Sequence, residues 1–149
     1  MFIIKTREYL GQLKNIDREI RDKQLLAQRY RDNAVSVSPK LTDVKVQSSG
    51  VPDKMAESIT KALDYEAEAN DDVVRLIELK HHIEEQIDGM READGNYGKT
   101  YYNILMGSYV HNMNVTALSR YIGYSPKQTR RLFDKSIKVF EVMYGEEYL

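Results

Sequence analysis

The chain contains no cysteine. Disulfides and thiolate metal sites are therefore impossible, and the protein would fold in the same way in a reducing compartment. No run of about eighteen apolar residues occurs, and the apolar stretch before Lys5 is too short for a signal peptide. These absences predict a cytoplasmic protein with no membrane segment.

Net charge is also small, at −1, but it is unevenly distributed. The first 94 residues carry 15 Lys and Arg against 19 Asp and Glu, whereas residues 95–149 carry 7 against 4. Between Gly95 and Phe140 the only acid is Asp134. This asymmetry is typical of a small nucleic-acid-binding module that is joined to an acidic segment of the same chain. A basic face that merely contacts water is the simpler alternative.

Residues 2–34 contain no proline and one glycine, Gly11. Apolar residues recur at alternating four- and three-residue steps, which predicts a long helix with one narrow apolar seam. Polar residues interrupt the apolar pattern at two positions, Thr6 and Lys23. The seam consists of Phe2, Tyr9, Leu13, Ile16, Ile20, Ala27 and Tyr30.

Helix-favouring residues stop at Val35, where valines alternate with serines and are followed by Pro39, Gly50 and Pro52. This composition predicts an irregular linker over residues 35–53. A short strand pair is the other possibility, but two isolated strands are only marginally stable. Its strand residues would be Val35, Val37, Leu41, Val44 and Val46.

A second seam begins near Pro52 or Asp53 and is interrupted at Glu66 and Lys80. It consists of Met55, Ile59, Ala62, Ala69, Val73, Leu76, Ile83, Ile87 and Met90. Two seamed helices joined by a linker most simply form an antiparallel hairpin, which would occupy residues 1–94. The alternative pairs the seams between two copies of the chain, so a homodimer through this arm is also expected.

A short hinge at 94–98 separates the arm from a second domain at 95–149. This domain opens with a helix that runs to about His111, and its apolar face consists of Tyr101, Ile104, Leu105, Tyr109 and Val110. Two further helices follow, which completes a three-helix module. The predicted fold class is therefore all-α: a long, coiled-coil-like helical hairpin followed by a small three-helix helix-turn-helix domain.

The segment from Asn114 to Lys138 has the pattern of a helix-turn-helix. Asn114 is the expected N-cap of its first helix, and Gly123, which is free to adopt a positive φ, ends that helix. Ser125 is the expected N-cap of the second helix, and Pro126 follows at the first helical position. The inward-facing residues are expected to be Val115, Leu118, Ile122, Thr129, Leu132, Phe133, Ser136, Ile137 and Phe140.

In a helix-turn-helix, the start of the second helix enters the major groove of double-stranded DNA. Arg and Lys can donate there to guanine, and Gln can pair with adenine. The residues placed for this role are Lys127, Gln128, Arg130 and Arg131, with Ser125 and Tyr124 in the turn and Arg120, Lys135 and Lys138 placed for phosphates. Short patterns of this kind also occur in protein-interaction domains, so that possibility stays open.

Other sites have weaker support in the sequence. The run from Gly95 to Thr100 ends like a phosphate-binding loop, but Ala93 stands where the loop needs its first glycine. His81 and His82 are adjacent and therefore point about 100° apart on a helix, which does not fit the zinc-hydrolase motif. No Ser or His has a spacing that suggests a nucleophile and its base. We therefore expect no enzymatic activity, no metal and no cofactor.

Several residues of the helix-turn-helix together resemble the C-terminal region 4 of sigma factors. They are Ile104, Leu105, Tyr109, Val115, Leu118, Ser119, Ile122, Gly123, Tyr124, Ser125, Gln128, Arg131, Leu132, Ser136 and Ile137. The pattern is closer still to the small sigma-like regulators of Gram-positive phages, the ArpU and RinA types. The segment Ser49–Ser58 and the acidic helix after it resemble the N-terminal arm of uncharacterised phage and prophage proteins, so the resemblance covers roughly residues 49–140.

This resemblance implies a phage or prophage transcriptional regulator of the late-gene activator type, which binds specific DNA sequences. RNA polymerase is a candidate partner, but the resemblance itself implies neither a promoter sequence nor a contact with RNA polymerase. The alternative hypothesis is an adaptor protein that binds RNA polymerase or a phage packaging component and makes no contact with DNA bases. The chain departs from the family at Val115, where an aromatic is usual, and at Ser119, Thr129 and Ser136, which leave hydroxyls near the core.

Overall fold

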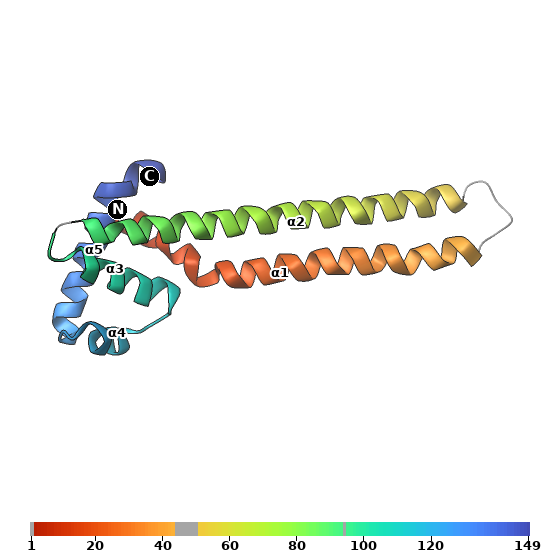
Figure 1. Ribbon diagram of the computed structural model, residues 1–149. Helices are drawn as coiled ribbons and strands as arrows, with labels where there is room; N and C mark the ends of the chain where they lie inside the picture. Colours follow the sequence, from red (N-terminus) through yellow and green to blue (C-terminus); the bar gives the residue numbers. More distant parts are fainter. Residues whose placement is uncertain (1, 44–50, 94) are drawn as a thin grey trace. The chain divides into compact units, whose positions relative to one another are not determined.

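The computed structural model describes residues 2–43, 51–93 and 95–149, and it confirms the all-α fold class (Figure 1). No strand occurs within these ranges. The helices are α1 (Phe2–Asp43), α2 (Val51–Gly89), α3 (Gly98–Leu105), α4 (Val115–Ile122) and α5 (Pro126–Tyr144). Short 3₁₀ turns cover Met90–Glu92 and Gly145–Glu147, and a π-helical turn covers Met106–Val110.

The described chain forms two compact units whose limits differ from the boundary predicted at residue 94. The hairpin unit is Arg18–Glu78. The helix-turn-helix unit combines Met1–Asp17 with Leu79–Leu149. Each of the two long helices therefore contributes to both units, and the beginning of α1 and the end of α2 belong with the C-terminal helices.

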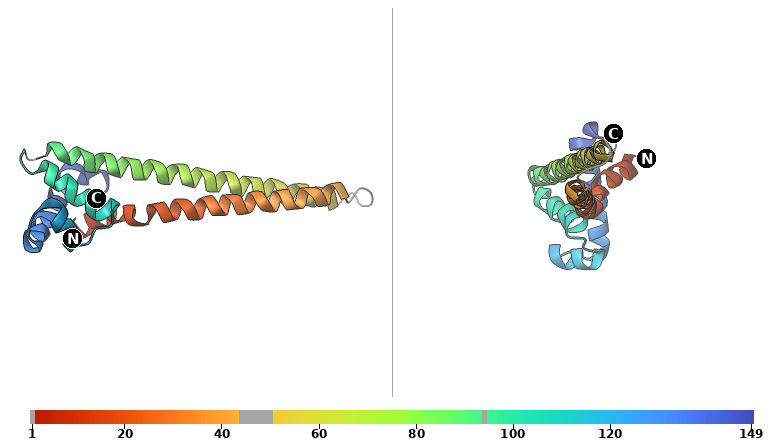
Figure 2. Two further views of the ribbon diagram at one scale, coloured as in Figure 1. Left: turned by 60° about the horizontal axis from the view of Figure 1, so that its bottom comes forward. Right: turned by 90° about the vertical axis from the view of Figure 1, so that its right-hand side faces the viewer.

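In the hairpin unit, α1 and α2 lie side by side and antiparallel, as the seams predicted (Figures 1 and 2). The seam positions that break the apolar pattern form ion pairs between the two helices. Lys23 Nζ lies 3.2 Å from an Asp72 carboxylate oxygen. Glu66 pairs with Arg31 at 3.5 Å. Such surface pairs contribute little stability, but a register shift between the helices would separate both of them.

The linker predicted at 35–53 is wrong at both of its ends. Helix α1 continues through Pro39 to Asp43, and α2 already begins at Val51; residues 44–50 lie outside the described residues. An established helix gains one hydrogen bond for each residue added, which outweighs the weak preference of valine and serine for other conformations. Pro52 falls in the first turn of α2, where its missing N–H costs nothing.

The core of the helix-turn-helix unit draws on both long helices and on α3 and α5. Its fully buried large side chains are Leu10, Ile16, Ile83, Ile87, Met90, Tyr101, Ile104, Leu105, Ile137 and Phe140. Thr6, one of the polar residues that interrupt the first seam, is also fully buried, and its hydroxyl bonds to Glu141 and Tyr148. The three-helix module predicted at 95–149 thus shares its core with segments far away in the sequence.

The C-terminal residues are held by tyrosines and by a polar chain. Tyr9 stacks on Tyr148 with ring centroids 4.0 Å apart. Tyr9 also donates to Gln86, and Gln86 donates in turn to Glu147. These contacts fix the residues that follow α5 against α1 and α2 inside the unit, so the orientation of α5 is determined by more than its neighbour α4.

Candidate nucleic-acid interface

Helix α4 begins and ends at the residues that the sequence indicated. The Asn114 side chain accepts a hydrogen bond from the Ala117 N–H at 2.8 Å, which caps the first turn. Gly123 ends the helix with φ at 79°, a left-handed conformation that favours glycine. The Gly123 and Tyr124 N–H groups both donate to the Ser119 carbonyl, so the turn into α5 is closed by backbone bonds.

Helix α5 starts as predicted at Pro126. The Ser125 hydroxyl oxygen accepts from the Gln128 N–H at 3.2 Å, and its carbonyl accepts from the Thr129 N–H at 2.8 Å. Ser125 was a candidate DNA contact, and its described role is to cap this helix. The cap fixes the direction in which the first turn of α5, with exposed Lys127 and Gln128, presents its side chains.

The hydroxyls predicted near the core all have partners. Ser119 Oγ lies 2.9 Å from Thr129 Oγ1, and Thr129 donates to the Ser125 carbonyl at 2.8 Å. Ser136 Oγ donates to the Phe133 carbonyl at 2.6 Å. The Ser119–Thr129 bond joins α4 to α5 inside the unit, where neither residue is more than 6% exposed. The Ser119–Thr129 contact therefore fixes the crossing of the two helices, whereas the Ser136 bond lies within α5.

Three basic residues form a line along the outer face of α5. Successive residues of a helix are rotated by about 100°, so Lys127, Arg131 and Lys138 fall within a narrow strip opposite the buried residues of α5. All three are exposed. We call this strip the basic line, and the buried residues opposite it are Thr129, Ser136, Ile137 and Phe140.

The other candidates border the basic line or lie away from it. Gln128 and Lys135 fall along one edge, and the Lys135 ammonium lies 5.5 Å from the Tyr97 ring centroid. Arg130 falls on the opposite side and lines a cavity. Arg120 projects from α4, and Tyr124, which is 37% exposed, lies in the turn. The structure thus brings together only part of the predicted set on one face.

The single acid within this basic region is paired with a residue that the sequence reasoning missed. Asp134 accepts from Arg7 of α1 at 2.5 Å. Arg7 also lies over the Phe133 ring at 5.2 Å. The ion pair reduces the negative field of Asp134 beside the basic line. No sequence pattern could have predicted it, because the partners are separated by most of the chain.

Buried tyrosines also lie close to this region. Tyr109, in the π-helical turn, is 5% exposed, and its ring centroid is 6.0 Å from that of Phe133. Burial raises the pKa of Tyr109, and the nearby positive charge of Arg7 partly opposes this shift. Tyr109 is therefore a neutral packing residue at neutral pH.

No metal or membrane feature competes with this surface in the part of the chain that the structure describes. No group of three or more potential ligand residues there is arranged to hold a metal ion. His81 pairs with Glu85 at 3.0 Å, whereas His82 reaches Glu147 at 3.0 Å, so the two adjacent histidines have different partners. None of the described helices combines the length and apolar character that a membrane span requires.

Comparison of the chain with protein-family models, curated proteins and solved structures gives no match.

Proposed function

We propose that this chain binds double-stranded DNA through the outer face of α5. The observation that supports the proposal is the basic line, three exposed cations opposite the buried face of a capped helix. From Lys127 to Lys138 the line extends for about 16 Å at 1.5 Å per residue. This length corresponds to roughly five base pairs measured along the DNA axis, at about 3.4 Å per base pair.

The first turn of α5 is the part that would read bases. Lys127 and Gln128 are exposed there, and their donor groups suit guanine and adenine edges in the major groove. Arg131, Lys135 and Lys138 lie further along the helix and suit phosphates. The Ser119–Thr129 bond supports this role because it keeps the first turn at a fixed angle to α4.

The binding surface can be tested with a charge-matched pair of variants. Arg131→Ala/Lys138→Ala should weaken binding to a random-sequence 30-base-pair duplex by at least about tenfold at low salt. Arg21→Ala/Arg29→Ala removes the same charge from exposed positions of the hairpin unit and should change binding by less than about twofold. Fluorescence anisotropy measures both, and circular dichroism checks that helicity is unchanged. Equal losses in the two variants would mean that only net charge matters.

The regulatory role is a further step of the proposal, which rests on the resemblance to sigma-like phage regulators. Such a protein would act in the cytoplasm, with RNA polymerase as a candidate partner that the resemblance itself does not imply. The homodimer through the helical arm stays a prediction. In vitro selection of bound duplexes would yield the operator; recovery of no common sequence would restrict the proposal to non-specific binding.

One observation favours the rival adaptor function. Val142, which is 86% exposed, lies near the basic line toward the end of α5, and Met143 beside it is 40% exposed. Met143 points away from the basic line, toward the edge of the buried face, so Val142 is the apolar side chain on this face, and it suits a protein partner better than a phosphate. Val142→Asp separates the two functions, because it should disrupt an apolar protein contact but reduce DNA affinity only slightly, by about the effect of one added charge.

A further inference from the structure

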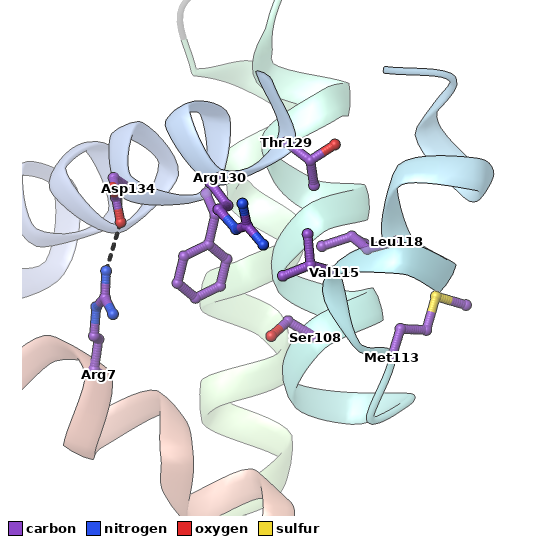
Figure 3. A pocket seen from close by; sticks show the side chains of 9 residues that line it. Arg7, Ser108, Met113, Val115, Leu118, Thr129, Arg130 and Asp134 are labelled. Carbon is purple, nitrogen blue, oxygen red and sulfur yellow. Dashed lines mark hydrogen bonds and ion pairs between the residues drawn. The ribbon is translucent and has the colours of Figure 1, made fainter. Parts of the chain in front are cut away.

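A cavity lies inside the helix-turn-helix unit, beside the crossing of α4 and α5 (Figure 3). Its volume is about 330 Å³, which is within the range of small-molecule sites. Side chains from α1, the π-helical turn, the segment before α4, α4 and α5 surround it. They are Arg7, Ser108, Met113, Val115, Leu118, Thr129, Arg130, Phe133 and Asp134.

The wall of the cavity is mainly apolar, and parts of it were expected to be closed core. Val115 and Phe133 belong to the inward-facing set, yet both are only half-buried because the cavity separates them from full packing. Leu118, at 2% exposure, forms a well-packed part of the same wall. A compact apolar group placed here would cover the exposed parts of Val115 and Phe133.

The π-helical turn contributes the remaining wall. Such turns are rare and occur often at functional sites. Here the turn brings Ser108 to the cavity, and Gly107 packs so closely that a Cβ on it would lie 2.8 Å from Leu118 Cδ1. Within the described part of the chain, the Ser108 hydroxyl makes no hydrogen bond. It therefore remains available to a bound molecule.

The charged groups around the cavity differ in their partners. Arg7 and Asp134 form an ion pair (Figure 3). The Thr129 hydroxyl bonds to Ser119 and Ser125. Arg130 has no carboxylate partner among the described residues. The cavity thus presents one unpaired guanidinium beside an apolar wall, which complements a single negative charge on an apolar molecule.

We propose that this cavity is a binding site for a small molecule with a compact apolar body and one anionic group. The apolar body contacts Val115, Leu118 and Phe133. The anionic group accepts from Arg130, and a neighbouring polar atom can bond to Ser108. This inference does not depend on DNA binding, because the site is defined by its own walls and its test uses no nucleic acid.

The probe for the test is 2-naphthoate, and its neutral amide, 2-naphthamide, is the matched ligand control. Isothermal titration calorimetry of the full chain should show naphthoate binding with a dissociation constant on the order of 1 mM or tighter. The amide should bind about tenfold more weakly, because it loses the charge-assisted bond to Arg130. Two-dimensional amide NMR should show shifts at residues 106–118 and 129–134.

Variants of the chain locate the site. Val115→Phe fills the cavity and should weaken naphthoate at least about tenfold while leaving the circular dichroism spectrum unchanged. Arg130→Gln should remove the preference for the carboxylate over the amide, whereas Arg131→Gln, whose side chain does not line the cavity, should preserve it. If neither probe binds, if Val115→Phe binds naphthoate as well as the parent does, or if both arginine variants lose the preference equally, the inference is overturned.

Discussion

The hydroxyl bond between α4 and α5 makes a quantitative prediction about the stability of the helix-turn-helix. Thr129→Val keeps the shape of a fully buried side chain but removes its donation to Ser125 and its acceptance from Ser119. Neither partner is left unsatisfied, because Ser119 still reaches the Val115 carbonyl and Ser125 still accepts from a backbone N–H. The Ser119 proton is shared between Thr129 and the Val115 carbonyl, so the substitution removes one hydroxyl proton and one hydrogen bond in total. The free energy of unfolding should therefore fall by about 0.5–1.5 kcal/mol.

Urea unfolding followed by circular dichroism measures this loss. The control is Thr60→Val, an exposed position on α2 whose hydroxyl donates only to the Ala56 carbonyl, and its effect should stay within about 0.5 kcal/mol. A double-mutant cycle between Ser119→Ala and Thr129→Val should give a coupling of about 0.5–1 kcal/mol. Equal effects of Thr129→Val and Thr60→Val, or a coupling near zero, would refute the claim that this bond joins the helices.

Two further predictions concern glycine and tyrosine. Gly98→Ala should be clearly destabilising, because its Cβ would lie 2.4 Å from two backbone carbonyl oxygens. Gly11→Ala, whose Cβ would have nothing within 4 Å, should instead stabilise α1 by roughly 0.5–1 kcal/mol. Thermal unfolding compares the two variants, and a change in melting temperature of the same sign in both would contradict the packing at Gly98. Burial raises the pKa of four tyrosines above 10.0, so the native state holds these phenol protons more tightly than the unfolded chain does. The contribution of these protons to the free energy of unfolding is complete below about pH 10, and it is lost as the pH rises through the raised pKa values. Absorbance titration should show phenols that ionise above about pH 10, and urea unfolding at several pH values should show a free energy of unfolding that falls as the pH rises above about 10. Full ionisation of all tyrosines near about pH 10 in the folded state would contradict this prediction. The four are Tyr9, Tyr109, Tyr144 and Tyr148.

The parts of the fold that depend on local chemistry could be predicted from the sequence. Asn114, Gly123 and Ser125 act as caps through bonds to residues at most four positions away, so a short segment of sequence is enough to predict their role. The hairpin could be predicted for a similar reason, since the seven-residue repeat of its seam requires one partner helix. Even the polar breaks in the repeat are informative, because Lys23 and Glu66 each pair across the hairpin.

The features that sequence reasoning missed depend on contacts between distant segments or on small energy differences. Thr6 interrupts the seam as a polar residue, yet it is buried because Glu141 and Tyr148 provide its hydrogen bonds. Arg7 and Asp134 are also far apart in the sequence, so their ion pair could not be predicted. The cavity beside Arg130 could not be predicted for the same reason, because Arg7 and Asp134 both line it. The helix over residues 35–38 was missed because the preferences of valine and serine are weak against helix propagation. Its continuation through Pro39 has no explanation in residue preference, because proline inside a helix costs about 3 kcal/mol.

The dependence of DNA affinity on salt tests the central claim most directly. If Arg131, Lys135 and Lys138 neutralise about three phosphates, log K should fall against log salt concentration with a slope of about −2.7 for the parent chain. Arg131→Ala/Lys138→Ala should reduce the slope to about −0.9, while the hairpin control Arg21→Ala/Arg29→Ala should leave it unchanged. A parent chain that does not bind duplex DNA at about 50 mM salt, or a slope that is the same in all three proteins, would contradict DNA binding through α5.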